Sequence, residues 1–283
     1  MSKKTEETVF RVLMITATIS IIAVLSLIII SVAVKAFPAL SWDMISKTPK
    51  GGFYFGKEGG ILNAITGSFY VATGATLFAF IIGAPVAFLI NLHYIKQKAI
   101  INIIRFFLDI MWGVPSIVYG AFGFSIMIYF GLKTSLLAGI ITVTLFIIPI
   151  MVRAMDEVLK EIPHNLLEAS YSLGSTHSET ALKIMFRQCV PGILTAILLS
   201  FGRAIGDAAS VLFTCGFTDY IPHSLNDQVA TLPLAIFFQL GSPVPEVQAR
   251  AYASAFILTC IILIISLSAR LLSKKYEKHK INF

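Results

Sequence analysis

The sequence predicts an all-α integral membrane protein with about six transmembrane helices. Of its 283 residues, 57% are hydrophobic and 13% are charged, whereas soluble globular domains carry about 25% charged residues. The mean hydropathy is +0.84. Long apolar segments account for these values, so the chain has room for one helical membrane domain and none for a separate soluble catalytic domain. We therefore expect a protein that is not an enzyme.

Six segments are long and apolar enough to cross a bilayer, which takes about 20 mainly apolar residues. They cover residues 12–34, 64–92, 106–130, 135–155, 191–215 and 249–272. The first has a basic flank, but its apolar run is longer than the about 7 to 15 residues of a signal-peptide core, so we expect a retained helix. Gly113-Val114-Pro115 and similar interruptions predict kinks within the helices.

The basic residues predict the orientation. Most of the 22 Lys and Arg residues flank the segments on the side that holds both termini. The positive-inside rule therefore places both termini in the cytoplasm, together with the polar stretch 156–190. The net charge of +7 reflects these flanks, and we expect the lipid bilayer and no nucleic acid as a partner.

Two longer connections, Phe37 to Asn63 and Phe217 to Gln248, lie on the opposite side. The second contains Leu232 to Leu240, an apolar run too short to span. We expect this run to be a re-entrant or interfacial piece at the outer mouth. The five His are scattered and the three Cys lack metal-type or disulfide-type spacing, so we expect no metal and no cofactor.

The polar stretch 156–190 predicts a helical hairpin whose first helix opens near Pro163. Positions i, i+3, i+4 and i+7 of that helix share one semi-apolar face. The residues at these positions are Leu166, Ala169, Ser170 and Leu173.

The hairpin turns at Gly174, which stands where a helix C-cap needs a left-handed residue. Thr176 and Glu179 then form a capping box that starts a second helix. We expect this second helix to run on into the fifth apolar segment.

These residues carry a family resemblance. Glu168-Ala169-Ser170, followed by Gly174 and Ile184, is similar to the E-A-A-x-x-x-G-x9-I signature of the coupling loop in membrane subunits of ABC importers. The resemblance implies a type I importer (MetI-like) fold, with a permease domain over 64–283, a cytoplasmic coupling loop over 156–190, and an N-terminal helix and outer loop over 1–63. The implied ATPase-coupling residues are Leu166, Glu168, Ala169, Ser170, Leu173 and Gly174.

Other stretches resemble the permease pair PstA and PstC of phosphate importers, from Arg105 to Leu272. They are Gly113-Val114-Pro115-Ser116-Ile117-Val118, Pro191-Gly192-Ile193 and Gly202-Arg203-Ala204-Ile205-Gly206-Asp207. Thr231-Leu232-Pro233 and Ser242-Pro243 are more similar to PstA. The resemblance implies the bacterial inner membrane and, as partners, a PstC-like permease subunit, two ATPase subunits and an external phosphate-binding protein.

Arg203 and Asp207 place two charges in the fifth segment, four residues apart and so on one helical face. A charge at the bilayer centre costs about 2.5 to 3.5 kcal/mol on insertion scales, so both should face protein or water. Two interpretations stay open. In one, the two residues form an ion pair beside a close helix contact at Gly202-x-x-x-Gly206. In the other, Arg203 lines an anion path, because a guanidinium suits phosphate geometry, and Asp207 holds it or acts as a gate.

Arg153 joins the predicted translocation path because it resembles a PstA position at the inner end of the fourth helix. An arginine at a helix end is equally an interfacial anchor. The sequence also departs from the family pattern at three places: Asp207 replaces the usual Glu, Arg187 stands at a usual Pro, and Ser170 replaces the second Ala of the motif. Without that Pro, we expect a straighter second hairpin helix.

Three functional hypotheses follow. The first is the permease subunit of an ATP-driven phosphate importer. The second is an ABC importer permease for another solute, such as molybdate, sulfate or an amino acid. The third is a self-sufficient secondary transporter, which would explain the charges of the fifth segment but not the hairpin, and no inverted repeat is evident in the sequence.

Overall fold

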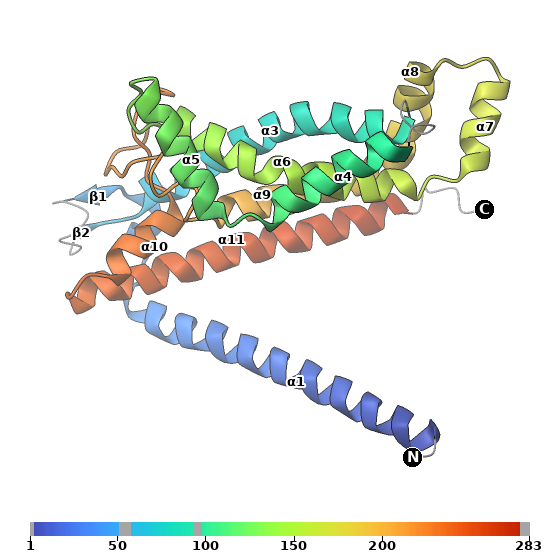
Figure 1. The fold of residues 1–283 in the computed structure, drawn as a ribbon. Helices are drawn as coiled ribbons and strands as arrows, with labels where there is room; N and C mark the ends of the chain where they lie inside the picture. The colour runs from blue at the N-terminus through green and yellow to red at the C-terminus, as the bar shows by residue number, and fades with distance from the viewer. Residues whose placement is uncertain (1–2, 51–57, 93–97, 278–283) are drawn as a thin grey trace.

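The computed structural model describes residues 3–50, 58–92 and 98–277 (Figure 1). Within these ranges the long helices are α1 (Lys3–Ala36), α3 (Leu62–Leu92), α4 (Lys98–Gly113), α5 (Ser116–Tyr129), α6 (Leu136–Lys160), α9 (Phe186–Ile205) and α11 (Pro245–Glu277). The short elements are the 3-10 helix η1 (Phe37–Ala39), α2 (Trp42–Ser46), α7 (His164–Ser172), α8 (His177–Glu179), the π-helix η2 (Thr180–Met185) and α10 (Leu232–Leu240). Two-residue strands, β1 (Pro49–Lys50) and β2 (Glu58–Gly59), pair antiparallel.

The predicted all-α membrane fold is confirmed. Five helices of the described chain are long and apolar enough to cross a membrane, and a bent pair brings the number to six if it counts as one span. The apolar run Leu232 to Leu240, expected to be a re-entrant or interfacial piece, forms the short helix α10 with the same bounds.

Two predicted spans differ from the structure. Residues 106–130 do not form one kinked helix, because α4 and α5 meet at 94°, and Pro115 is the N-cap of α5. A proline pushes the residue before it out of the helical region, which explains a break at Val114. The predicted segment 191–215 ends as a helix at Ile205, and turns follow at residues 206 and 209–215.

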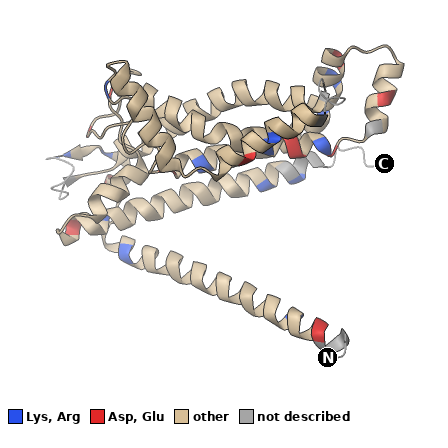
Figure 2. Ribbon diagram, viewed as in Figure 1, with Lys and Arg blue, Asp and Glu red and all other residues tan. Residues whose placement is uncertain are grey.

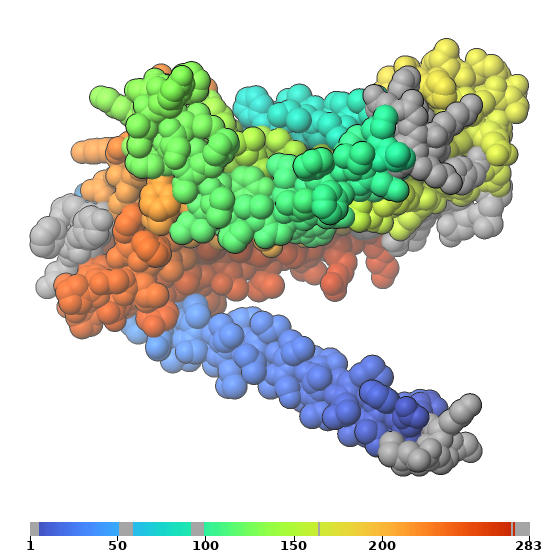
Figure 3. Space-filling model, in the orientation of Figure 1, coloured from blue at the N-terminus to red at the C-terminus, as the bar shows by residue number. Residues whose placement is uncertain are grey.

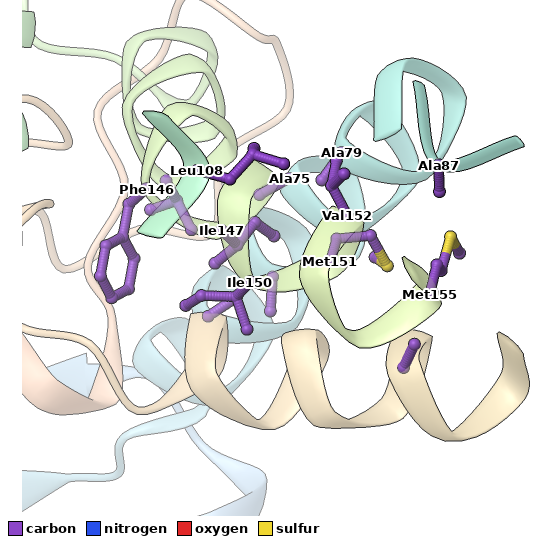
Figure 4. Packing of buried hydrophobic residues seen from close by; sticks show 14 of the residues in the cluster. Ala75, Ala79, Ala87, Leu108, Phe146, Ile147, Ile150, Met151, Val152 and Met155 are labelled. Carbon is purple, nitrogen blue, oxygen red and sulfur yellow. The ribbon is translucent and has the colours of Figure 1, made fainter. Parts of the chain in front are cut away.

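The centre of the bundle is the pair α3 and α6. Their interface sets small residues of α3, Ala75, Ala79 and Ala87, against the large apolar side chains of α6 (Figure 4). A Cβ added at Gly83 of α3 would lie 3.1 Å from Val152 of α6. Small residues let helix backbones approach closely, and the close approach gives the packing energy that holds membrane helices together.

Helix α1 diverges from this bundle. Its span has none of its residues buried, and Figure 3 shows it separated from the other helices over most of its length. The contact lies near its C-terminal end, where Lys35 Nζ donates to Tyr252 Oη of α11 at 3.2 Å. The apolar sides of α1 are thus free to face lipid or another subunit.

Candidate functional site

The hairpin at one end of the bundle has a buried side and an exposed side. On α7, Leu167 and Ser170 are 7% and 3% exposed, whereas Leu173, the C-cap of this helix, is 87% exposed. Glu168 and Ala169 are exposed beside Leu173. These three residues form the outward face of the hairpin.

Two members of the predicted coupling face lie elsewhere. Leu166 is half-buried and packs against the main core cluster, and Ser170 points into the hairpin. The helical spacing was predicted correctly, but the four residues of the predicted face are divided between the buried side and the exposed side of the hairpin. The tertiary packing of α7 against the bundle decides which residues face outward.

The predicted turn is confirmed. Gly174 has φ +81°, a conformation in which a residue with a side chain is strained. Its amide donates to the Tyr171 carbonyl at 2.9 Å, and the next amide, of Ser175, donates to the Ser170 carbonyl at 3.3 Å. The capping box is also present, with the Glu179 amide donating to Thr176 Oγ1 and the Thr176 amide donating to Glu179 Oε2.

The second hairpin helix continues through η2 into α9, as predicted, and Arg187 lies in that continuous stretch. Between its first turn, α8, and α9 it is a π-helix, which the sequence did not reveal. Thr180 at the start of η2 is fully buried, and its Oγ1 lies 2.9 Å from Oγ of Ser170. This hydroxyl pair joins the two arms of the hairpin at the position where the family pattern has Ala.

Arg203 lies in the last turn of α9 and is exposed. Its guanidinium carbon is 5.4 Å from the ring centroid of the buried Phe146 of α6, a cation–π distance. Within the described residues Arg203 forms no ion pair. A Cβ added at the neighbouring Gly202 would meet nothing within 4 Å, so the surface around this arginine is open.

An ion pair between Arg203 and Asp207, one of the two interpretations left open by the sequence, is not among the ion pairs of the described residues. Helix α9 ends at Ile205, so the spacing of four no longer puts both side chains on one helical face. Asp207 Oδ2 instead accepts from the Ser210 amide at 2.8 Å. The carboxylate stabilises the turn after the helix and leaves the guanidinium to other partners. Of the two glycines in the same interpretation, Gly206 contacts another helix: a Cβ added there would lie 3.4 Å from Ile262 of α11, whereas one added at Gly202 would meet nothing within 4 Å.

Asp156, near the end of α6, is a site residue that the sequence analysis missed. It is fully buried and accepts from Arg105 of α4 through two bonds, from Nε at 3.0 Å and from Nη2 at 2.9 Å. Asn91 of α3 donates to the same carboxylate at 2.9 Å. Arg153 and Lys160, one turn away on either side along α6, lie 3.3 and 3.0 Å from it. One carboxylate thus connects three helices.

Arg153 belongs to this cluster. Beyond Asp156, its Nε lies 3.3 Å from Asp109 of α4, and its Nη2 lies 3.5 Å from Glu157. Charged residues gather where α4 and α6 approach the hairpin (Figure 2). The sequence signal that could have indicated this cluster is the spacing of three and four residues between Asp156 and the charged residues near it.

The chain is similar to known membrane components of transport systems. The family described as "Binding-protein-dependent transport system inner membrane component" matches residues 83–278. The "Phosphate transport system permease protein PstA" of Haemophilus influenzae is 33% identical over 86% of this chain and 85% of its own length. That of Pasteurella multocida is 32% identical over 89% and 88%. The PstA 1 protein of Mycobacterium tuberculosis is 33% identical over 76% and 70%.

The chain therefore belongs to the family of binding-protein-dependent transport system inner membrane components, in the branch of the PstA permeases. Solved structures agree on the fold. A chain of the inward-facing MetNI methionine ABC transporter matches with a TM-score of 0.62 at 18% identity, over 76% of this chain and 95% of that one. An amino acid ABC transporter crystallised with histidines matches with a TM-score of 0.54 at 18% identity, over 77% and 93%.

Proposed function

We propose that the chain is the membrane-spanning permease subunit of an ATP-driven phosphate importer. In this function it forms half of the translocation path and carries out no chemistry itself. ATP hydrolysis takes place in a separate subunit that contacts the hairpin. The PstA relatives support phosphate as the solute. The environment of Arg203 also supports it, because this arginine has donors available for an anion.

Arg203 is placed to meet an anion inside the membrane. Phe146, over which it lies, is ten residues from the start of α6, so the guanidinium stands about 15 Å along a helix of about 37 Å. Its open surroundings and its lack of an ion pair among the described residues leave its donors available. A guanidinium fits the oxygens of a phosphate through two parallel hydrogen bonds. Because Arg203 is on the surface of the single chain, a second permease subunit would close the path around it.

The outward face of the hairpin, Glu168, Ala169 and Leu173, is the proposed ATPase contact. An exposed leucine on a short helix suits docking into a groove of the partner. Leu166 and Ser170 would support the face from behind, and Gly174 would permit the sharp return. Movement of the ATPase subunits would then tilt the permease halves between two states as rigid bodies.

The assembly proposed around this chain contains a PstC-like permease subunit, two ATPase subunits and an external phosphate-binding protein. In the bacterial inner membrane, both termini and the hairpin would lie in the cytoplasm. Residues 1–63 would be an addition to the permease domain of residues 64–283, and the exposed α1 would contact lipid or the second permease subunit.

The test is phosphate uptake in cells that lack their own high-affinity importer and receive this chain with its neighbouring subunits. We expect wild type to restore uptake and Arg203→Gln to assemble without restoring it. Arg187→Gln, which removes an exposed arginine from the same helix, is the matched control and should retain uptake.

Other outcomes would revise the proposal in separate parts. Uptake by Arg203→Gln at the wild-type rate would remove Arg203 from the path. If the wild-type complex assembles and hydrolyses ATP but does not transport phosphate, the chain would still be an ABC importer permease. Its solute would then be another, such as molybdate, sulfate or an amino acid.

A further inference from the structure

A cavity of about 320 Å³ lies at the hairpin end of the bundle, away from Arg203. Its walls come from α3, α4 and α6, and from the hairpin itself through Leu167 of α7 and Met185 of η2. Met185 and Arg203 are 18 residues apart along a continuous helix, which corresponds to roughly 27 Å. The cavity is therefore far from Arg203.

The polar wall of the cavity is positively charged. Arg105 and Lys160 line it, together with the amides Asn91 and Asn102, and none of the described residues that line it is a carboxylate. Asp156, which binds both cations, is fully buried behind them. Arg105 is thus fixed in place by a carboxylate that does not itself reach the cavity. Lys160 is held by the same carboxylate and by Glu157, whose Oε1 accepts from Nζ at 2.9 Å, so one of its three donors remains.

Both cations keep donors for a further ligand. The bonds from Arg105 to Asp156 use Nε and Nη2, which leaves Nη1 without a bond to that carboxylate. The side chains of Arg105 and Lys160 remain 25% and 33% exposed. A guanidinium and an ammonium, held at the rim of a cavity by a buried acid, are suited to a tetrahedral oxyanion.

We propose that this cavity binds a phosphate group between the membrane core and the hairpin. Two sources share this chemistry. One is free inorganic phosphate on the hairpin side of the membrane, and the other is the headgroup of an anionic phospholipid, whose chains would meet the apolar wall at Ile90, Ile101 and Leu159. Because Leu167 and Met185 belong to the same cavity, the bound group would stabilise the hairpin against the bundle.

The test variant is Asn102→Asp. Asn102 is exposed at the rim of the cavity and forms no hydrogen bond that the described structure records, so the change adds a negative charge and leaves the shape intact. Asn102→Ser is the matched uncharged control. All preparations carry Arg203→Gln, so that phosphate bound at the proposed path does not enter the measurement.

The full chain, purified with its partner permease and ATPase subunits and without the external phosphate-binding protein, is placed in nanodiscs of phosphatidylcholine for the first arm. Binding of radioactive inorganic phosphate is measured by equilibrium dialysis. In the second arm, nanodiscs contain phosphatidylcholine and phosphatidylglycerol, and native mass spectrometry counts the phosphatidylglycerol retained by each complex. We expect Asn102→Asp to weaken binding about tenfold or more in one arm, through charge repulsion at close range, and Asn102→Ser to leave it unchanged.

The arms separate the two sources. An effect on inorganic phosphate alone identifies the free ion, and an effect on phosphatidylglycerol alone identifies the lipid. Equal binding by the Arg203→Gln complexes with and without Asn102→Asp in both arms, or no binding in either, overturns the inference. That result would leave the proposed role of Arg203 untouched, since Arg203 is tested by uptake.

Discussion

Arg203 and Asp156 are both charged residues of membrane-spanning helices, and their surroundings are opposite. Asp156 is fully buried, with two hydrogen bonds from Arg105, one from Asn91 and two further cations within 3.3 Å. Arg203 is exposed, and its recorded contact is the ring of Phe146. A saturated charge holds helices together, whereas a charge with free donors is available to a ligand. Burial and partners therefore distinguish the two roles where residue type does not.

The largest effect on stability is expected at Asp156. Asp156→Ala leaves three cations facing an empty position, and breaking a buried pair from one side costs about 3–5 kcal/mol. Thermal unfolding of the purified protein measures the loss. Glu157→Gln, whose carboxylate is 57% exposed, should change stability by less than about 1 kcal/mol. If Asp156→Ala unfolds at the same temperature as the wild type, the charged cluster does not hold the helices together.

Gly174→Val should cost about 1–2 kcal/mol, because a branched side chain is strained at φ +81°. We expect the variant to insert and assemble, but to hydrolyse ATP without phosphate uptake. Gly131 also has positive φ and open space around its Cβ position, and it lies in the α5–α6 connection. Gly131→Val therefore reproduces the strain and should keep uptake coupled. Normal uptake in Gly174→Val would reject the coupling assignment.

The hydroxyl pair in the hairpin tests a smaller contribution. Ser170→Ala or Thr180→Val alone leaves one buried hydroxyl without its partner and should cost about 1 kcal/mol or more. The double variant should cost less than the sum of the two, with a coupling energy of about 0.5–1.5 kcal/mol from the unfolding midpoints. Additive losses would mean that the two hydroxyls do not interact.

The smallest change in stability is expected at Arg203. Arg203→Gln removes an exposed side chain with no ion pair in the described structure, so unfolding should shift by less than about 0.5 kcal/mol. Together with a loss of uptake, this result would show that Arg203 serves transport and contributes little to stability, in contrast to Asp156. A large loss of stability would instead make Arg203 a structural residue.

Local signals of the sequence were read correctly in the hairpin. Gly174 and the box of Thr176 and Glu179 act through bonds to residues within four positions, so the amino acids nearby are sufficient to predict them. The apolar runs of α3, α6 and α11 are similarly visible, since each must be long enough to cross the bilayer.

The end of α9 could not be predicted in this way. Residues 206–215 are apolar enough to continue the helix, but the chain there packs closely against α5. A Cβ added at Gly120 of α5 would lie 2.7 Å from the Ala209 carbonyl oxygen. Hydropathy does not report such an approach between distant segments, so the sequence predicted a helix to residue 215, on which Arg203 and Asp207 would share one face.

The sequence by itself determined the membrane class, the hairpin and the family, because composition, caps and motif spacing are local properties. Only the tertiary structure decided that Asp156 is saturated, that Arg203 is free of Asp207, and that Ser170 faces Thr180. Partners such as Asn91 and Arg105 lie 65 and 51 residues from Asp156. Contacts over such separations exist only after the helices pack, and helix packing depends on the combined shape of all their faces.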